Sequence, residues 1–101
     1  MEEIYLAVVN NVRPKRGGLK NGYTMINQIV LGVYAFASEA RGKIYSTYEE
    51  HGDFFSNEGK RRKTLYSVET WSIGVGSDLE ESEEYTVDEL AGLEFVEESN
   101  E

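Results

Sequence analysis

The stretch that decides the fold reads Ile29-Val30-Leu31-Gly32-Val33-Tyr34-Ala35-Phe36 and continues as Ala37-Ser38-Glu39-Ala40-Arg41-Gly42-Lys43-Ile44. Its first half is a run of aliphatic, β-branched and aromatic residues, which is typical of a strand buried on both faces. In the second half apolar residues recur at three- and four-residue steps, which indicates a helix that ends at Gly52. Ser38 has the side chain of an N-terminal cap. A strand that leads directly into a helix is therefore the unit around which the other elements must fit.

Two further apolar runs predict the remaining strands. Residues 4–9 are continuously apolar, as in a central strand, and Asn10-Asn11 ends that run. The second strand begins near Met25 or Ile26 and continues to about Phe36. The third covers residues 64–75, and a bulge near residues 69–70 would reconcile its two mixed faces.

These elements predict an α+β fold, in which a three-stranded antiparallel sheet of order 2-1-3 packs against one helix. A right-handed crossover places the first strand in the middle. Residues 77–84 have no apolar period and predict a polar linker. Thr86-Val87-Asp88-Glu89 matches a capping box and predicts an acidic C-terminal helix to about residue 97. The 101 residues thus divide into a β-β-α-β core domain, residues 1–76, and an acidic linker with a C-terminal helix, residues 77–101.

Charge is sorted along the chain. Residues 1–76 hold all 10 Lys and Arg against 8 Asp and Glu, whereas residues 77–101 hold 11 Asp and Glu and no cation. An acidic segment of this kind repels phosphate and attracts cationic surfaces. The topology also brings the two cationic loops to one end of the molecule; their residues are Arg13, Lys15, Arg16, Lys20, Lys60, Arg61, Arg62 and Lys63.

Composition excludes several classes of protein. The absence of cysteine excludes disulfides, a thiol nucleophile and thiolate metal sites. No apolar run has the length of a membrane span, and the N-terminus is acidic where a signal peptide is basic. We expect a protein of the cytoplasm of the host cell, with no cofactor and no membrane partner.

Catalytic and metal-binding motifs are weak. The single histidine, His51, lies among carboxylates but lacks the spaced ligands of known metal sites, and it suits a helix C-terminus instead. Arg16-Gly17-Gly18 matches neither a P-loop nor a dinucleotide fingerprint, and no Gly-x-Ser-x-Gly elbow occurs. The sequence therefore predicts no catalytic residues and no enzyme activity.

The order of elements resembles that of small proteins of phages and mobile elements with a β-β-α-β core. The resemblance covers residues 4–75 and lies in the short first strand, in the strand that leads into the helix, and in the aromatic strand Leu65-Tyr66-Ser67-Val68-Glu69-Thr70-Trp71-Ser72-Ile73. Most such proteins have no assigned activity, so the resemblance implies no site residue. Size and acidity are also similar to those of phage inhibitors that mimic DNA with carboxylates.

Three functions follow as hypotheses. The first is a protein–protein inhibitor or DNA mimic that contacts the basic surface of a nucleic-acid-handling protein through Glu80, Glu81, Glu83, Glu84, Asp88 and Glu89. The second is a nucleic-acid-binding module that uses the two basic loops and is inhibited by its own acidic tail. The third is a homo-oligomer that binds an anionic, nucleotide-like ligand.

Overall fold

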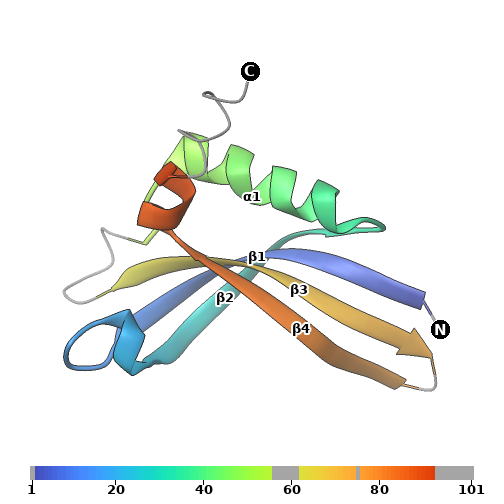
Figure 1. Ribbon diagram of the computed structural model, residues 1–101, viewed down its shortest axis with the longest axis horizontal. Coiled ribbons are helices and arrows are strands. Elements are labelled where there is room, and N and C mark those ends of the chain that lie inside the picture. The colour runs from blue at the N-terminus through green and yellow to red at the C-terminus, as the bar shows by residue number, and fades with distance from the viewer. Residues whose placement is uncertain (1, 56–61, 75, 93–101) are drawn as a thin grey trace.

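The computed structural model describes residues 2–55, 62–74 and 76–92. Its elements in chain order are β1 (Glu2–Pro14), the 3-10 helix η1 (Leu19–Asn21), β2 (Tyr23–Tyr34), α1 (Ala37–His51), β3 (Lys63–Gly74) and β4 (Gly76–Thr86). Residues 87–92 are helical. The strands form one antiparallel sheet in the order β2-β1-β3-β4, and α1 lies across one face of it (Figure 1). No helix among the described residues has the length and apolar character that a membrane crossing requires.

The expected α+β fold with β1 between β2 and β3 is confirmed, whereas the predicted number of three strands is wrong. The residues predicted as a polar linker form β4, which pairs with β3 from Gly74↔Gly76 to Leu65↔Thr86. The ladder is made by backbone groups, so it does not depend on the polarity of the side chains. An edge strand that α1 does not cover can therefore be acidic along its length.

β1 is longer than its apolar run because two asparagines are accommodated in the interior. Asn10 is 2% exposed, and its amide donates to the Leu65 carbonyl at 2.8 Å and to Ser67 Oγ at 2.9 Å. Its Oδ1 accepts from Gln28 Nε2 at 2.9 Å. These bonds offset the cost of burying an amide, so the prediction that Asn10-Asn11 ends the strand is wrong.

The main core lies between the sheet and α1. Alternation along each strand directs Ala7 and Val9 of β1 and Val68 of β3 toward the helix. The helical residues 87–92 close this core at one end, where Leu90 is 3% exposed. The buried members of the cluster are Ala7, Val9, Ala40, Ile44, Phe55, Tyr66, Val68 and Leu90.

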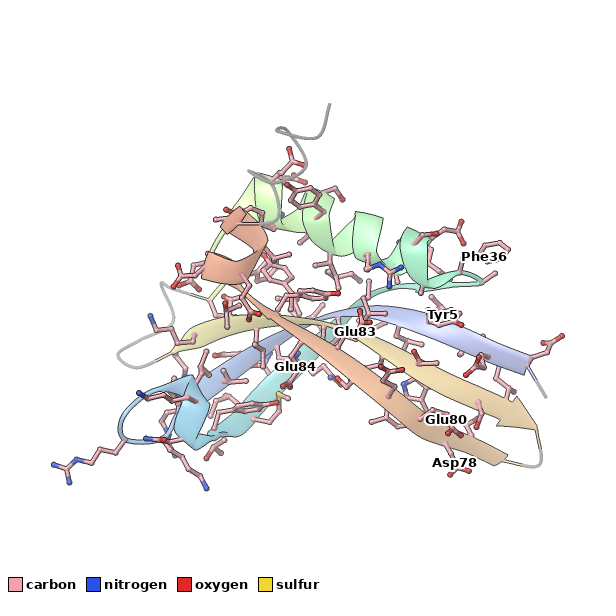
Figure 2. All side chains as sticks on the ribbon, viewed as in Figure 1. Tyr5, Phe36, Asp78, Glu80, Glu83 and Glu84 are labelled. Carbon is pink, nitrogen blue, oxygen red and sulfur yellow. The ribbon has the colours of Figure 1, made fainter. Side chains whose placement is uncertain are left out.

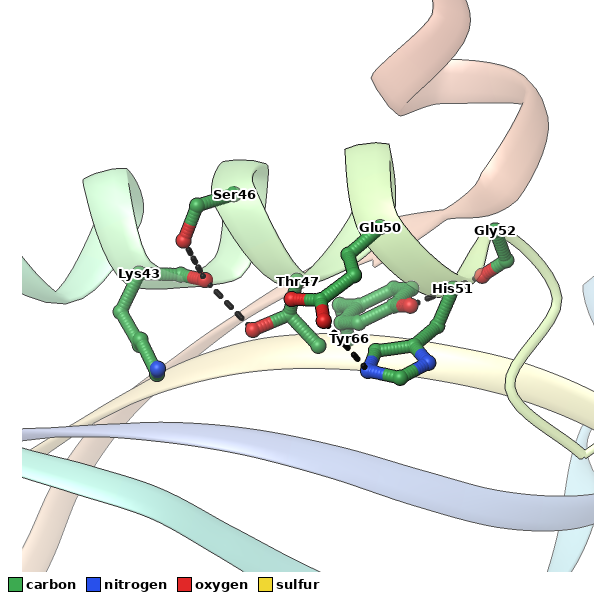
Figure 3. A network of polar contacts seen from close by, with 7 residues as sticks. All are labelled: Lys43, Ser46, Thr47, Glu50, His51, Gly52 and Tyr66. Atoms are coloured by element: carbon green, nitrogen blue, oxygen red, sulfur yellow. Dashed lines mark hydrogen bonds and ion pairs between the residues drawn. The ribbon is translucent and has the colours of Figure 1, made fainter.

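α1 begins two residues earlier than a cap at Ser38 predicts. Phe36 is its N-cap, and the Phe36 N–H donates to the Glu39 carboxylate at 3.2 Å, so the assignment of Ser38 as the cap is wrong. The helix ends at Gly52, as expected, with φ of 60°, a left-handed conformation that favours glycine. Tyr66 of β3 ties this end to the sheet, because its hydroxyl donates to the Gly52 carbonyl at 2.8 Å (Figure 3).

The second strand is not buried on both faces. β2 is an edge strand, and residues 24–30 are all exposed. Its pairing with β1 contains two β-bulges, at which Ile26 and Leu31 have no partner residue in β1. The expected bulge near residues 69–70 is also displaced: β3 pairs regularly with β1, and the extra residue is Glu80 of β4.

Candidate functional site

The Glu80 bulge collects carboxylates on one face of β4. Asp78, Glu81 and Glu83 lie opposite Ser72, Thr70 and Val68, which belong to the side of β3 that faces α1. Glu80 is the extra residue, and its carboxylate reaches the same side, where it accepts from Ser72 Oγ at 2.8 Å. Without a bulge, Glu80 and Glu81 would point to opposite faces. Figure 2 shows the labelled Asp78, Glu80, Glu83 and Glu84 following one another along β4.

We call Asp78, Glu80, Glu81 and Glu83 the acidic row. Alternate residues of a strand are about 6.7 Å apart, so like charges lie close together here. Arg41 of α1 contacts the row at its end, where its Nη1 is 3.6 Å from Glu83 Oε2. The other ion pair among the described residues joins His51 and Glu50, outside the row. The cations that the structure describes therefore leave most of this charge uncompensated.

Two members of the row have no partner within the described part of the chain. Glu80 and Glu83 accept hydrogen bonds from Ser72 and from the Tyr85 hydroxyl, the latter at 2.7 Å. Asp78 and Glu81 take part in no hydrogen bond or ion pair with the described residues, and both are exposed. Their carboxylates are the ones most available to an external cation.

The remaining predicted contact residues lie elsewhere. Glu84 points to the opposite face of the sheet, where it accepts a hydrogen bond from the Tyr23 hydroxyl. Glu89 closes the expected capping box: the Thr86 N–H donates to its carboxylate at 3.0 Å, and its own N–H donates to Thr86 Oγ1 at 3.1 Å. Asp88 follows the cap and is exposed. The six predicted residues thus divide into the row, one residue behind it, and two in the terminal helix.

Two tyrosines that donate hydrogen bonds to carboxylates of β4 have raised pKa values. Burial first, and then the hydrogen bond to Glu84, raises the pKa of Tyr23 to about 12. Burial and the hydrogen bond to Glu83 raise the pKa of Tyr85 to about 12. Both phenols remain donors through the physiological pH range, so these two carboxylates are held in place.

The described residues of the two basic loops gather at the other end of the sheet. Val12 of β1 lies opposite Lys63 of β3, so the β1–β2 connection and the start of β3 share one end, as the topology predicted. A shallow site of about 530 Å³ there is lined by Arg13, Pro14, Lys15, Arg16 and Thr24. Lys20 lies in η1 and Arg62 directly precedes β3. Lys60 and Arg61 lie outside the described residues.

β4 brings the end of the acidic segment back to this basic end. A depression of about 200 Å³ is shared by Lys63 and Asp88, with Leu19, Asp53, Thr64, Thr86 and Val87 as its other walls. This return is made by a paired strand, so the acidic row itself, which lies opposite residues 68–72 of β3, stays at a distance from the two basic loops.

The remaining chemistry is limited. His51 Nε2 is 3.9 Å from Glu50 Oε1 (Figure 3). The imidazole packs edge-on against Phe54 with ring centroids 5.0 Å apart. Among the described residues, no group of three or more acidic, histidine or cysteine side chains is placed to hold a metal ion. A largely apolar cavity of about 430 Å³ lies between α1 and the end of β4, lined by Ser38, Arg41, Gly42, Ile44, Tyr45, Tyr85 and Leu90.

Sequence reasoning missed Asp78 as a member of the row. Its position follows only from the register of β4, which no side-chain pattern indicated.

A search of protein-family models, one of curated proteins and one of solved structures each found no match to this chain.

Proposed function

We propose that this protein is a small binding protein that acts by protein–protein contact, with the acidic row of β4 facing a basic surface on a partner. The observation that carries this proposal is the bulge at Glu80, which places four carboxylates on one face of an exposed edge strand. Such a row complements lysines and arginines on another protein and would speed and orient their encounter.

A partner that handles nucleic acid would offer the right surface. Proteins that bind nucleic acids present clustered cations to regularly spaced phosphates. Asp78, Glu81 and Glu83 pair with alternate residues of β3, so they follow one another at about 6.7 Å and offer such a surface a series of anions. The protein would then act as an inhibitor or DNA mimic of the kind that phages or mobile elements encode. We expect no catalytic step.

The test is a pair of double variants with the same net charge. D78N/E81Q removes the two row carboxylates that have no internal partner, and E49Q/E50Q removes two exposed carboxylates at the far end of α1. Immobilised poly-lysine serves as the probe. We expect D78N/E81Q to weaken binding about tenfold and the control less than about threefold, with both affinities falling as salt rises. Equal effects would mean that only net charge matters, and the proposal would fail.

Substitution is the appropriate design because β4 is part of the sheet. Removal of residues 77–101 would expose the paired edge of β3 and the core around Leu90. A loss of binding in such a truncated chain would report unfolding rather than recognition.

A second function is favoured by the Val12↔Lys63 pairing, which brings basic residues from both loops to one end. We propose, as the alternative, nucleic-acid binding through Arg13, Lys15, Arg16, Lys20, Arg62 and Lys63. Here K15Q/R16Q should abolish retention on heparin and duplex DNA, whereas D78N/E81Q should strengthen it because the chain repels phosphate less. If K15Q/R16Q leaves DNA retention unchanged, this alternative is excluded.

A further inference from the structure

β2 has the composition of a central strand but the position of an edge strand. Strands with apolar residues on both faces are normally flanked by two neighbours and covered on both sides. β2 has β1 on one side and, among the described residues, no strand on the other. The sequence and the position of this strand are therefore in conflict within a single copy of the chain.

The conflict is visible as exposed apolar surface. Val30 and Val33 project on the face that α1 does not cover, since they lie opposite Val8 and Leu6. Ile29 lies opposite Val9 on the helix side. Six large apolar residues of β2 and the turn after it are between 38% and 66% exposed: Met25, Ile26, Ile29, Val30, Val33 and Phe36. These exposed side chains lie on both faces of one edge strand, and exposed apolar surface of this kind marks an interaction site.

The two edges of the sheet differ completely in charge. β2 has no Asp, Glu, Lys or Arg in its 12 residues, whereas β4 has five carboxylates in 11. Charged side chains are the usual means by which an edge strand avoids pairing with other chains. β4 is protected in this way, and two copies of it would repel each other. β2 has no such protection and is electrically neutral, so it can face an identical strand without repulsion.

The polar residues in the middle of β2 do not prevent such pairing. Asn27 Oδ1 accepts from Asn11 Nδ2 at 3.0 Å, and Gln28 Nε2 donates to Asn10 and Glu69 at 2.9 Å. These amides make hydrogen bonds within their own chain, so covering them costs less than burying unpaired groups. The regular segment 27–30 lies between the two bulges and is free to form a ladder.

We propose that a second copy of this chain pairs with β2. The two β2 strands run antiparallel about a two-fold axis near the middle of the strand, which is the self-complementary arrangement of the commonest dimers. The result is a continuous eight-stranded sheet. Because β2 and β4 are opposite edges, the two acidic β4 strands lie at the two outer edges, as far apart as the sheet allows. This separation suits a chain of net charge −9.

The first test measures the mass of the intact protein in solution. The chain mass is 11.5 kDa, and we expect twice that mass by sedimentation at about 100 µM and a shift toward the single-chain mass on dilution. V30K/V33K places two lysines on the exposed β2 edge and should weaken dimerisation at least about tenfold. L79K is the matched control, because Leu79 of β4 is 50% exposed, close to the 51% of Val30.

A second measurement does not depend on the variants remaining fully stable. The chain has no cysteine, so single cysteines at Ile29 and at Leu79 can be compared by treatment with a short bis-maleimide. Ile29→Cys should give the cross-linked dimer and Leu79→Cys should not, because only β2 residues near the axis meet their own copies. A single-chain mass at about 100 µM would overturn the proposal and leave the edge open to a strand of another protein. A dimer disrupted by L79K but not by V30K/V33K would also overturn it.

Discussion

The hydroxyl of Tyr23, at the start of β2, donates a hydrogen bond to the carboxylate of Glu84, near the end of β4. These strands are the two edges of the sheet, so the contact spans the face that α1 does not cover. Strong right-handed twist must curl the sheet for its edges to approach in this way. The curl explains why Val8 and Val12, which project on this face, are completely buried although α1 lies on the other face.

Substitution of Tyr23 by phenylalanine tests how much this contact holds the curl. We expect Y23F to lower the free energy of unfolding by about 1 kcal/mol, because the Glu84 carboxylate loses its donor. Urea denaturation measures the effect. Y5F is the control, since the Tyr5 hydroxyl has no hydrogen-bond partner among the described residues. Equal stability of the two variants would show that the curl is set by the backbone alone.

Alkaline pH should destabilise the fold in a defined window. The pKa of Tyr66 is raised to about 12 by burial and by the nearby Asp53, and those of Tyr23 and Tyr85 are also about 12. Tyrosine in the unfolded chain has a pKa near 10. Between these values the unfolded state binds fewer protons than the folded state, so the contribution of these three tyrosines to the free energy of unfolding is fully present below about pH 10 and is lost toward pH 12.

Ultraviolet titration of the tyrosines checks this window directly. Tyr23, Tyr66 and Tyr85 should ionise late in the folded protein and near pH 10 once it unfolds. In Y66F one late phenol should disappear. Ionisation of all three near pH 10, without loss of structure, would contradict the proposed environments.

Leu90 should be as important to stability as the residues of the sheet core. It is 3% exposed and belongs to the cluster that includes Ile44 and Val68. Leu90→Ala should lower the free energy of unfolding by about 2–5 kcal/mol, because it leaves a cavity in a packed site. Leu79→Ala is the matched control on an exposed position and should change stability by less than about 0.5 kcal/mol. Similar costs would mean that the helical residues 87–92 do not close the core.

Thr86, which caps a helix, and Ser38, which the sequence predicted as a cap, should differ in their effect on stability. Thr86→Ala removes the reciprocal bonds with Glu89 and should cost about 1 kcal/mol. Ser38→Ala should be close to neutral, because Phe36 is the N-cap of α1 and Glu39 already satisfies its N–H. Thermal unfolding of both variants gives the comparison. A larger loss from Ser38→Ala would restore Ser38 as the cap.

Most of the sheet could be predicted from apolar periodicity, and the parts that could not have physical reasons. The order of β1, β2 and β3 and the unit of β2 and α1 followed from apolar runs. β4 was invisible because its strand character comes from backbone pairing with β3 and not from its side chains. β1 was predicted too short, since only the folded structure supplies the partners that satisfy the buried Asn10.

The candidate site shows the same division. The sorting of charge along the sequence identified the acidic segment, and topology placed the basic loops at one end. The sequence could not show that Glu80 and Glu81 share a face, because this depends on one unpaired residue in a ladder. The sequence also predicted β2 to be buried on both faces, because its apolar composition is that of a central strand although the strand lies at the edge of the sheet.

Because Glu80 is an extra residue in the ladder, the number of carboxylates on this face of β4 can change by the insertion or deletion of one residue. Thr70 pairs with Glu81 and Trp71 with Leu79, so deletion of Glu80 would leave every other pair unchanged and produce an unbroken ladder. A lineage could therefore gain or lose one anion on this surface by a single-codon insertion or deletion, without altering the turn before the strand or the cap after it.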